Sequence, residues 1–360
     1  MKPPLKPEFK RAAATRLDWL EAFHALDAKR FDFAIRPVEP VPRFFITGKP
    51  VSTPGNLTNI IAQAKAGKSA FVGSLIAAAI AADQKIEGAD TLGVTATAPG
   101  QKILIHFDTE QSVFDHDQLV RRAMSRAGAD SMPDWLWSYP LAGFGAEELR
   151  NMLTVAMWAA SERGGVFAAI VDGTADLVSD VNDAEECNGL VSHLHALAIR
   201  YDCPIVNVIH ENPGANFGKM RGHLGSQLER KAESNIRMTK ADEITIVFAD
   251  KMRRAPISEK DGPRFTWSDQ AGMHVSCETA GEERNDAKRD NLRDQVEAVF
   301  IAAGLPSLAW GALREGIEKS EGIGQSGARK RIEAMKKLGV IQKNVIGHWE
   351  LTPQRPDNAP

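Results

Sequence analysis

The stretch A-Q-A-K-A-G-K-S at residues 62–69 decides the fold. Gly67, Lys68 and Ser69 match the end of the phosphate-binding pattern G-x-x-x-x-G-K-[ST]. In that pattern backbone N–H groups surround a phosphate, the lysine reaches phosphate oxygens and the hydroxyl holds Mg²⁺. Ala62 stands where the pattern has its first glycine, which frees a strained backbone position. The motif predicts a nucleotide site, and Ala62 raises the question whether that site turns nucleotide over or only binds it.

The residues on both sides of this stretch favour a phosphate-binding loop over a chance match. Residues 57–61, L-T-N-I-I, form a short β-branched run that predicts a buried parallel strand. Residues 70–82 are apolar almost all round, which predicts a helix packed against a sheet, with its N-terminus toward a phosphate. We expect the nucleotide to contact the loop and the first helical residues, namely Ala64, Lys65, Ala66, Gly67, Lys68, Ser69 and Ala70.

Composition excludes several classes of protein. The chain has 360 residues, 43% hydrophobic and 25% charged, enough for one large globular core and a small appended domain. A net charge of −3 excludes a polyanion-coating protein, so any nucleic-acid contact must come from local patches. Three cysteines without C-x-x-C spacing indicate a reducing cytoplasm, and no apolar run approaches the roughly 18–20 residues of a membrane span.

Two later apolar runs end in acidic residues. Residues 102–107 lead into Asp108 and Glu110, and residues 166–171 lead into Asp172. Open α/β sheets bind ligands at the carboxyl ends of their strands. Glu110 is therefore the candidate general base for water that attacks a γ-phosphate, and Asp172 is the candidate carboxylate that holds Mg²⁺ together with the P-loop serine. The alternatives are that Asp108 or Glu110 only caps the next helix, residues 113–128, and that Asp172 only caps a turn.

A third apolar run, residues 203–209, ends at His210. This histidine could sense the γ-phosphate through a hydrogen bond, or it could be a core histidine that the backbone satisfies. Residues 211–226 follow and combine glycines with Phe217, Lys219 and Arg221. The composition indicates a mobile loop that binds single-stranded DNA through charge and stacking, and an ordinary flexible loop is the alternative.

Two cations follow a predicted strand pair, residues 236–239 and 244–249. Strand alternation places Lys251 and Arg253 on one side, which suits two cations that reach one phosphate. Near the start of the chain, apolar residues at helical spacing predict a helix around residues 19–26, followed by a proline-rich extended lead-in. That lead-in could pack on a neighbouring subunit or clamp the edge of its own core.

Six segments in this order resemble the RecA-type ATPases: A-x-x-x-x-G-K-S, F-D-T-E-Q-S, I-V-D-G-T-A-D-L, N-V-I-H-E-N-P-G, R-G-H-L-G-S and K-M-R-R-A-P. Within them the chain is most similar to the RepA-like hexameric helicases of plasmids and phages. The resemblance covers roughly residues 40–270. It implies a RecA-like α/β fold, a mostly parallel sheet flanked by helices, and a ring or filament with ATP and Mg²⁺ between subunits.

The resemblance also implies a role for each site residue. Lys68 and Ser69 would hold phosphate and Mg²⁺, Glu110 would be the catalytic carboxylate, Asp172 the Walker B residue and His210 the sensor.

For the remaining segments, the resemblance implies contacts outside the subunit's own site. Lys251 and Arg253 would reach into the neighbour's site, and the loops at residues 176–188 and 211–226 would face DNA in the centre of a hexameric ring. We expect a Mg²⁺-ATP-dependent, DNA-acting ATPase, a ring helicase of DNA replication or mobilisation. Two alternatives remain: a strand-exchange or recombination-mediator ATPase that forms filaments, and a DNA regulator that binds nucleotide without hydrolysis.

The last part of the chain has a different character. Residues 279–291 are dense in charge, which is typical of a linker. Three predicted helices, 292–303, 308–320 and 326–338, and a β-hairpin at 340–351 resemble a winged helix. Arg329 and Lys330 fall on its third helix, which often reads the major groove, although many winged helices bind only protein.

Together these predictions divide the chain into five segments: a helix and arm (1–45), a RecA-like ATPase core (46–275), a charged linker (276–291), a winged-helix-like domain (292–353) and a tail (354–360).

Overall fold

The computed structural model describes residues 16–63, 65–211, 220, 222–241, 243–254, 256–277 and 280–352. The chain divides into two units, Met1–Pro40 and Val41–Pro360, and each is described by itself. The first unit contains α1 (Arg16–Asp27), the helix that the sequence predicts, and its large apolar side chains are exposed.

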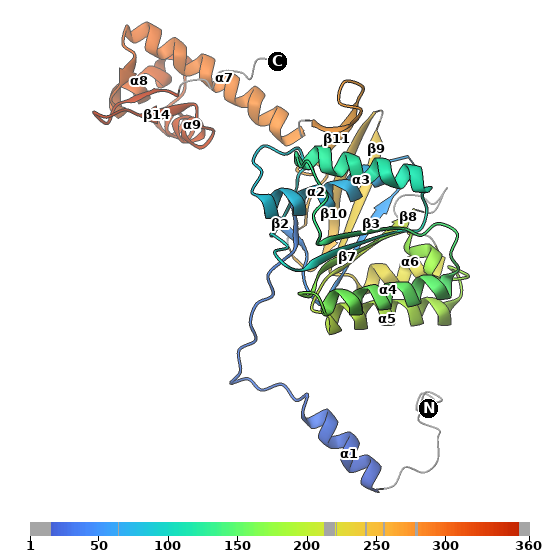
Figure 1. Cartoon of the computed structure of the whole chain (residues 1–360). Coiled ribbons are helices and arrows are strands. Elements are labelled where there is room, and N and C mark those ends of the chain that lie inside the picture. The colour runs from blue at the N-terminus through green and yellow to red at the C-terminus, as the bar shows by residue number, and fades with distance from the viewer. Residues whose placement is uncertain are drawn as a thin grey trace. The chain divides into compact units, whose positions relative to one another are not determined.

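A large sheet organises the second unit (Figure 1). Among the described residues it has nine strands in the order β12-β11-β10-β9-β3-β8-β7-β5-β6. The six strands from β9 to β6 are parallel, and β10, β11 and β12 extend the sheet in antiparallel fashion. Their bounds are β3 (Leu57–Ala62), β5 (Ile103–Asp108), β6 (Leu136–Pro140), β7 (Val166–Asp172), β8 (Ile205–His210), β9 (Ser234–Ala241), β10 (Ile244–Met252), β11 (Arg264–Ser268) and β12 (Met273–Cys277).

Helices cover both faces of this sheet. In Figure 1, α2 and α3 lie on one face, and α4, α5 and α6 lie on the other. The bounds are α2 (Lys68–Gln84), α3 (Val113–Ala127), α4 (Ala146–Ser161), α5 (Ala184–Arg200) and α6 (Gly222–Lys231). Strands β3, β5 and β7 are buried along their whole length, as parallel strands between two helical layers must be. The expected α/β class with a mostly parallel sheet flanked by helices is confirmed.

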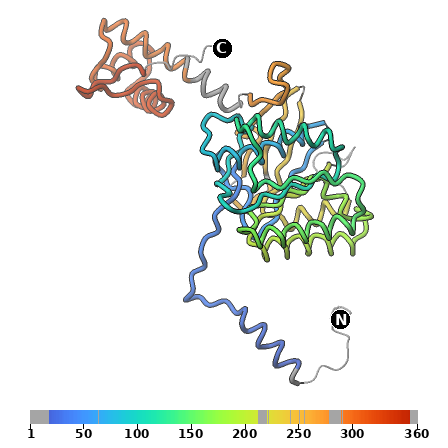
Figure 2. Tube along the Cα trace, in the orientation of Figure 1, coloured from blue at the N-terminus to red at the C-terminus, as the bar shows by residue number. Residues whose placement is uncertain are grey.

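Buried asparagines fix the register of the central strands. Asn59 of β3 lies opposite Asn207 of β8 and Asn235 of β9. Its amide donates to Asn235 Oδ1 at 2.7 Å, and the amide of Asn207 donates to Asn59 Oδ1 at 3.3 Å. A slip of one residue would leave these buried amides without partners, at a cost of about 1–3 kcal/mol each. Figure 2 shows how chain segments far apart in sequence, in blue and yellow, meet here.

A small second sheet answers one question that the sequence left open. Strand β1 (Phe44–Ile46) lies between β2 (Lys49–Ser52) and β4 (Val94–Ala96). The side chains of Phe44 and Ile46 are fully buried in the same hydrophobic core as the large sheet. Residues 44–46 therefore pack on their own core.

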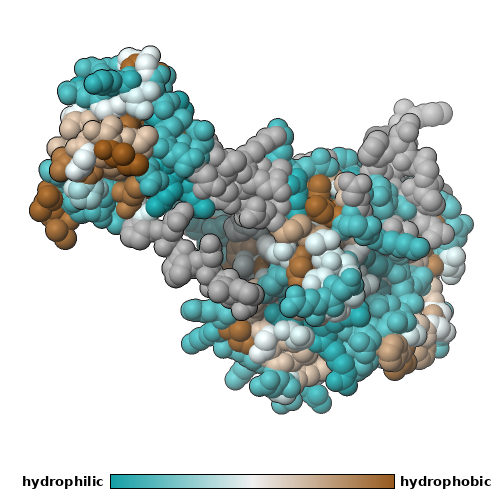
Figure 3. All heavy atoms as spheres, turned by 90° about the horizontal axis from the view of Figure 1, so that it is seen from above, coloured by the Kyte–Doolittle hydropathy of each residue, from teal (hydrophilic) through white to brown (hydrophobic). Residues whose placement is uncertain are grey.

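Buried apolar residues from Leu292 to Trp349 form a hydrophobic cluster separate from the core of the large sheet. Helices α7 (Ala280–Ala303), α8 (Trp310–Glu321) and α9 (Gln325–Lys337) accompany a three-stranded antiparallel sheet, β13 (Ser307–Leu308), β15 (Trp349–Leu351) and β14 (Ile341–Lys343). On the face drawn in Figure 3, apolar atoms gather on this part of the molecule. The exposed large apolar residues of this part are Ile301, Leu305, Trp310, Val345 and Ile346.

Three sequence expectations differ from the structure. The stretch predicted as a linker is helical from Ala280, because Glu, Lys, Arg and Ala favour a helix even without an apolar face. The predicted loop at 211–226 ends earlier, since α6 begins at Gly222. The two strands predicted at 340–351 belong to a sheet with a third strand, β13. That strand has only two residues, too few to give a recognisable sequence pattern.

Helix α4 offers a matched test of the core. Leu153 is fully buried and Val155, two residues later, is 60% exposed. Leu153→Ala should lower the free energy of unfolding by about 2–5 kcal/mol, because it leaves a cavity in the core. Val155→Ala should change it by less than about 0.5 kcal/mol. Urea denaturation followed by circular dichroism measures both, and equal effects would contradict the packing described here.

Candidate active site

The loop between β3 and α2 has the backbone of an anion site. Gly67 precedes the first residue of α2 with a φ of 76°, a left-handed conformation that favours glycine. A Cβ at this position would also meet the ring of Phe265 at 2.7 Å. Lys65 has a φ of 65° as well. The loop thus turns sharply and directs the N-terminus of α2 toward the site, where a helix favours negative charge.

The backbone at residue 62, where this chain has alanine, does not require a glycine. Ala62 is the last residue of β3 and pairs in regular register with His210 and Met238 on its two sides. It does not belong to the described residues with a positive φ, and its carbonyl accepts a hydrogen bond from the Glu211 N–H at 3.1 Å. The departure from the usual pattern therefore introduces no backbone strain at this position.

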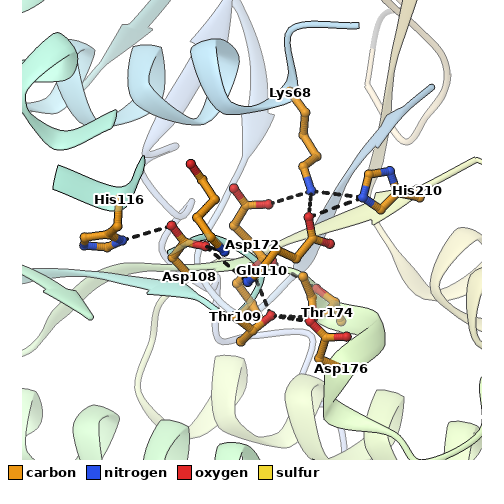
Figure 4. A network of polar contacts seen from close by, with 12 residues as sticks. Lys68, Asp108, Thr109, Glu110, His116, Asp172, Thr174, Asp176 and His210 are labelled. Carbon is orange, nitrogen blue, oxygen red and sulfur yellow. Dashed lines mark hydrogen bonds and ion pairs between the residues drawn. The ribbon is translucent and has the colours of Figure 1, made fainter. Parts of the chain in front are cut away.

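Three strand ends deliver polar side chains to Lys68 (Figure 4). Its Nζ forms an ion pair with Glu110 Oε2 and lies 3.1 Å from Asp172 Oδ1 and 3.3 Å from His210 Nε2. Asp172 ends β7, His210 ends β8, and Glu110 follows the end of β5. These strands are neighbours in the sheet, so the expectation that their polar ends meet at one edge is confirmed.

The charges of this cluster depend on one another. Burial alone would lower the pKa of Lys68, but the charges of Asp172 and Glu110 outweigh it and raise the pKa. Burial would raise the pKa of Glu110, yet hydrogen bonding with His210 and the charge of Lys68 lower it to about 2. Glu110 is therefore a carboxylate at neutral pH.

Asp172 is the least satisfied member of the cluster. It is fully buried, and neither carboxylate oxygen accepts a hydrogen bond from the described residues, although Oδ1 faces the Lys68 ammonium. Burial raises its pKa to about 6 against the opposing charge of Lys68. A buried carboxylate with an open oxygen is a suitable partner for a hydrated cation beside a phosphate.

The donor set fits Mg²⁺ bound together with a nucleotide. Mg²⁺ keeps several waters and takes one or two protein oxygens plus phosphate oxygens, so it needs no protein-only cage. Within the described ranges, no group of three or more His, Cys, Asp or Glu side chains could hold a metal alone. Ser69 follows Lys68 at the start of α2, Asp172 ends β7 beside Lys68, and these are the residues that would hold the ion.

The capping alternative for Glu110 does not hold. Asp108 Oδ1 accepts the backbone N–H groups of Glu110 and Gln111, at 3.3 and 3.1 Å. The N-cap of α3 is Ser112, whose hydroxyl accepts the N–H of Asp115. Because other residues satisfy the turn and the helix, the Glu110 side chain is free to face Lys68. His210, with 39% of its side chain exposed, is likewise a site residue and not a core histidine.

Sequence reasoning missed a buried network behind this turn. Asp108 Oδ2 lies 2.9 Å from His116 Nδ1, His116 Nε2 lies 3.0 Å from Ser138 Oγ, and Ser138 Oγ lies 2.9 Å from His106 Nδ1. Burial lowers the pKa of His106 to about 4, so this ring is neutral at pH 7. A chain of donation from His106 through Ser138 and His116 to Asp108 gives each polar hydrogen one acceptor. It anchors the carboxylate that shapes the Glu110 turn.

Gly173, directly after Asp172, permits the close approach of two strand ends. Its φ is 103°, and a Cβ there would lie 2.0 Å from Thr109 Oγ1 and 2.9 Å from Glu110 Cγ. Thr109 in turn donates its backbone N–H to the Asp172 carbonyl and its hydroxyl to Asp176 Oδ2 at 2.8 Å. A side chain at this glycine would push Glu110 and Asp172 apart.

Lys251, near the end of β10, and Arg253, just after this strand, lie away from Lys68. Thr245, near the start of β10, donates to the Ala66 carbonyl, and Lys251 lies six residues later, about 20 Å along an extended strand. Lys251 pairs with Glu229 of α6 at 2.5 Å, and Arg253 donates to Asn56 Oδ1 at 3.0 Å. The structure does not bring either cation to the Lys68 site of the same chain.

The predicted DNA-contacting residues are only partly described. Phe217, Lys219 and Arg221, like Ala64 of the phosphate-binding loop, lie outside the described residues. The two predicted DNA loops meet, since the Leu224 N–H donates to the Val181 carbonyl at 3.0 Å.

The basic residues of α9 are described. Arg329 and Lys330 are exposed on that helix.

Lys68 and the phosphate-binding loop line a cavity of about 690 Å³. This volume lies within the usual range for small-molecule sites, about 300–1,000 Å³. Glu110 and His210 share it, and it continues along α3 toward Trp267.

Across the described part of the chain, no helix is long and apolar enough to cross a membrane.

Comparison with models of known protein families gave no match, and comparison with curated proteins gave none either. A lysine at a helix N-terminus, an ionised glutamate, a buried aspartate and a histidine can bind a phosphate, hold its cation and accept a proton from water.

The raised pKa of Asp172 predicts a stability effect. Its value of about 6 exceeds the ordinary 3.8, so the folded state binds this proton more tightly than the unfolded chain. The resulting stabilisation is present below pH 4 and is lost as the pH rises through 6. In metal-free buffer, Asp172→Asn should raise the free energy of unfolding at pH 8 by about 2–3 kcal/mol and change little at pH 4. Denaturant titrations at both pH values measure this.

The matched control is Asp117→Asn, which neutralises an exposed aspartate of α3 that pairs with Arg121. It should show no comparable gain at pH 8. A wild-type protein as stable as Asp172→Asn at pH 8 would contradict the cost assigned to the buried carboxylate.

Proposed function

We propose that this protein is a Mg²⁺-ATP-dependent, DNA-acting ATPase with a RecA-like core, and that it works as a ring helicase in DNA replication or mobilisation. One observation carries the nucleotide part of the proposal. Lys68, at the N-terminus of α2, meets Glu110, Asp172 and His210 at three adjacent strand ends. The order of sequence segments that resembles the RepA-like helicases supports the DNA part.

Each residue of the site has a role in phosphoryl transfer. Backbone N–H groups of residues 65–70 would surround the phosphates, and Lys68 would bind their oxygens. When bound, Mg²⁺ would neutralise phosphate charge, with Ser69 and Asp172 as its protein partners. Glu110 is ionised at neutral pH and would accept a proton from the attacking water. His210 shares contacts with Lys68 and Glu110 and would respond to the γ-phosphate.

The position of Lys251 and Arg253 supports hydrolysis between subunits. Both cations are exposed and lie beside α6, at the far end of β10 from the phosphate-binding loop. Cations that cannot reach their own site but lie at the surface can act in a neighbour's site. An arginine supplied from a second subunit neutralises transition-state charge and makes hydrolysis depend on assembly.

The C-terminal part supports a second DNA contact. Three helices with a three-stranded antiparallel sheet are compatible with a winged helix. Arg329 and Lys330 are exposed on the third of these helices, the element that enters the major groove in many such domains. We propose that these cations contact DNA phosphates.

The ATPase assignment predicts the behaviour of two variants. Lys68→Ala should reduce phosphate release by at least about a hundredfold, because it removes the cation that binds the transferred phosphate. Glu110→Gln should reduce turnover by a similar factor while nucleotide binding persists, since it removes only the proton acceptor. Phosphate release with and without single-stranded DNA measures both, with Glu147→Gln on the outer surface of α4 as the control.

Equal turnover by Glu110→Gln and wild type would remove this residue from the mechanism. Wild-type protein that binds ATP without DNA-stimulated release would instead favour a nucleotide-binding regulator. Closed rings in negative-stain images support the helicase, whereas helical filaments on single strands favour a strand-exchange ATPase.

The assignment of Arg253 to a neighbour's site predicts complementation. Arg253→Ala and Lys68→Ala subunits should each be inactive alone. The Arg253→Ala subunit lacks the cation that acts in the neighbour's site, and the Lys68→Ala subunit lacks a working phosphate site of its own. Mixed in equal amounts, they should recover some phosphate release, since intact half-sites then meet at shared interfaces. A titration of mixing ratios measures the recovery, and no recovery at any ratio would contradict the assignment.

A further inference from the structure

The cavity that contains Lys68 is longer than a phosphate site requires. It follows α3 from Phe114 to Arg122, about 12 Å along the helix axis, and reaches the β11–β12 hairpin. Lys68, Glu110 and His210 line one part of it. On the hairpin side it is lined by Trp267, Met273 and His274, together with Arg122 of α3.

A continuous series of edge-to-face ring contacts joins the phosphate-binding loop to Trp267. The ring of Phe265 lies against Gly67. His274 meets Phe265 edge to face, with centroids 5.4 Å apart, and meets Trp267 in the same way at the same distance. The Arg122 guanidinium then lies 5.5 Å from the centroid of the Trp267 ring. These ring contacts place the aromatic surface of Trp267 at a fixed position relative to the loop.

Polar contacts hold the hairpin in place. The Arg126 side chain, which lines the cavity, donates to the His274 carbonyl and to the Asp90 carbonyl, both at 2.6 Å. The Ser276 N–H donates to Asp90 Oδ2 at 2.8 Å. The hairpin is thereby tied to α3 through Arg126 and to the segment between α2 and β4 through Asp90.

Trp267 is suited to stacking and not to hydrogen bonding. Its indole N–H already donates to Asp269 Oδ1 at 2.8 Å, yet 44% of the residue is exposed. An exposed indole whose only donor is satisfied offers a π surface to a planar ligand. The Arg122 guanidinium, which lies over the Trp267 ring, is a second planar group of the kind that stacks on bases.

We propose that the hairpin side of the cavity, at Trp267, is the base subsite of a nucleoside triphosphate, with Trp267 and Arg122 as its stacking platform. This inference rests on the proposed function, which places the phosphates at Lys68. The ligand class is a nucleoside triphosphate of any base, because every base has a π face and the platform reads none of its hydrogen-bonding edges. Purines overlap the indole over a larger area than pyrimidines do, so they bind more tightly.

Calorimetric titration of the full-length protein with two probes in Mg²⁺ buffer tests the subsite. One probe is AMP-PNP, which carries a base, and the other is inorganic tripolyphosphate, which carries none. Trp267→Ala should weaken AMP-PNP binding about fivefold or more and leave tripolyphosphate binding within about twofold. Trp267→Phe, which retains a ring, should restore most of the AMP-PNP affinity. Trp158→Ala, which removes an exposed tryptophan of α4, is the matched control and should change neither.

Two results would overturn the subsite. AMP-PNP affinity unchanged in Trp267→Ala would show that the base does not stack there. Equal weakening of both probes would show that Trp267 only supports the phosphate-binding loop. Lys68→Ala separates this inference from the proposed function, because it should weaken both probes in the same proportion. If Lys68→Ala binds both probes as the wild type does, the proposed function fails, and the subsite fails with it.

Discussion

The ammonium group of Lys68 lies between two carboxylates at the edge of a parallel sheet, and the rest of the site depends on this arrangement. Asp172 is fully buried and has no other cation near it among the contacts described, so its charge is tolerable only beside Lys68. Glu110 keeps its low pKa through hydrogen bonding with His210 and the charge of the same lysine. Because a buried charge without a partner is costly, each member of the cluster constrains the position of the others.

The backbone brings these groups together through sheet register. Asp108 and Asp172 lie opposite each other at the ends of β5 and β7, and Ala62 lies opposite His210. The buried asparagines of three neighbouring strands fix that register in the middle of β3. A sheet that slipped by one residue would turn these strand ends to opposite faces.

Close approach of backbone segments provides the remaining precision. Gly67 lets the β11–β12 hairpin reach the phosphate-binding loop, and Gly173 lets Thr109 reach the end of β7. Both glycines also have positive φ values, so space and conformation require the same residue. The hydrogen-bonded chain from His106 to Asp108 supports the Glu110 turn from behind. The loop, the turn and the hairpin are thus held by groups outside the Lys68 cluster.

The sequence by itself determined the tight loop before α2, the strands that end at Asp172 and His210, and the placement of Glu110 beyond a third strand. These features depend on local patterns, an apolar run followed by a polar residue or a glycine, which each segment carries alone. Only the tertiary structure decided that Ala62 is unstrained, that Asp108 and not Glu110 caps the turn, and that His116 and Trp267 belong to the site. Those outcomes depend on contacts between residues far apart in the chain, such as Gly67 with Phe265, and no local pattern encodes such contacts.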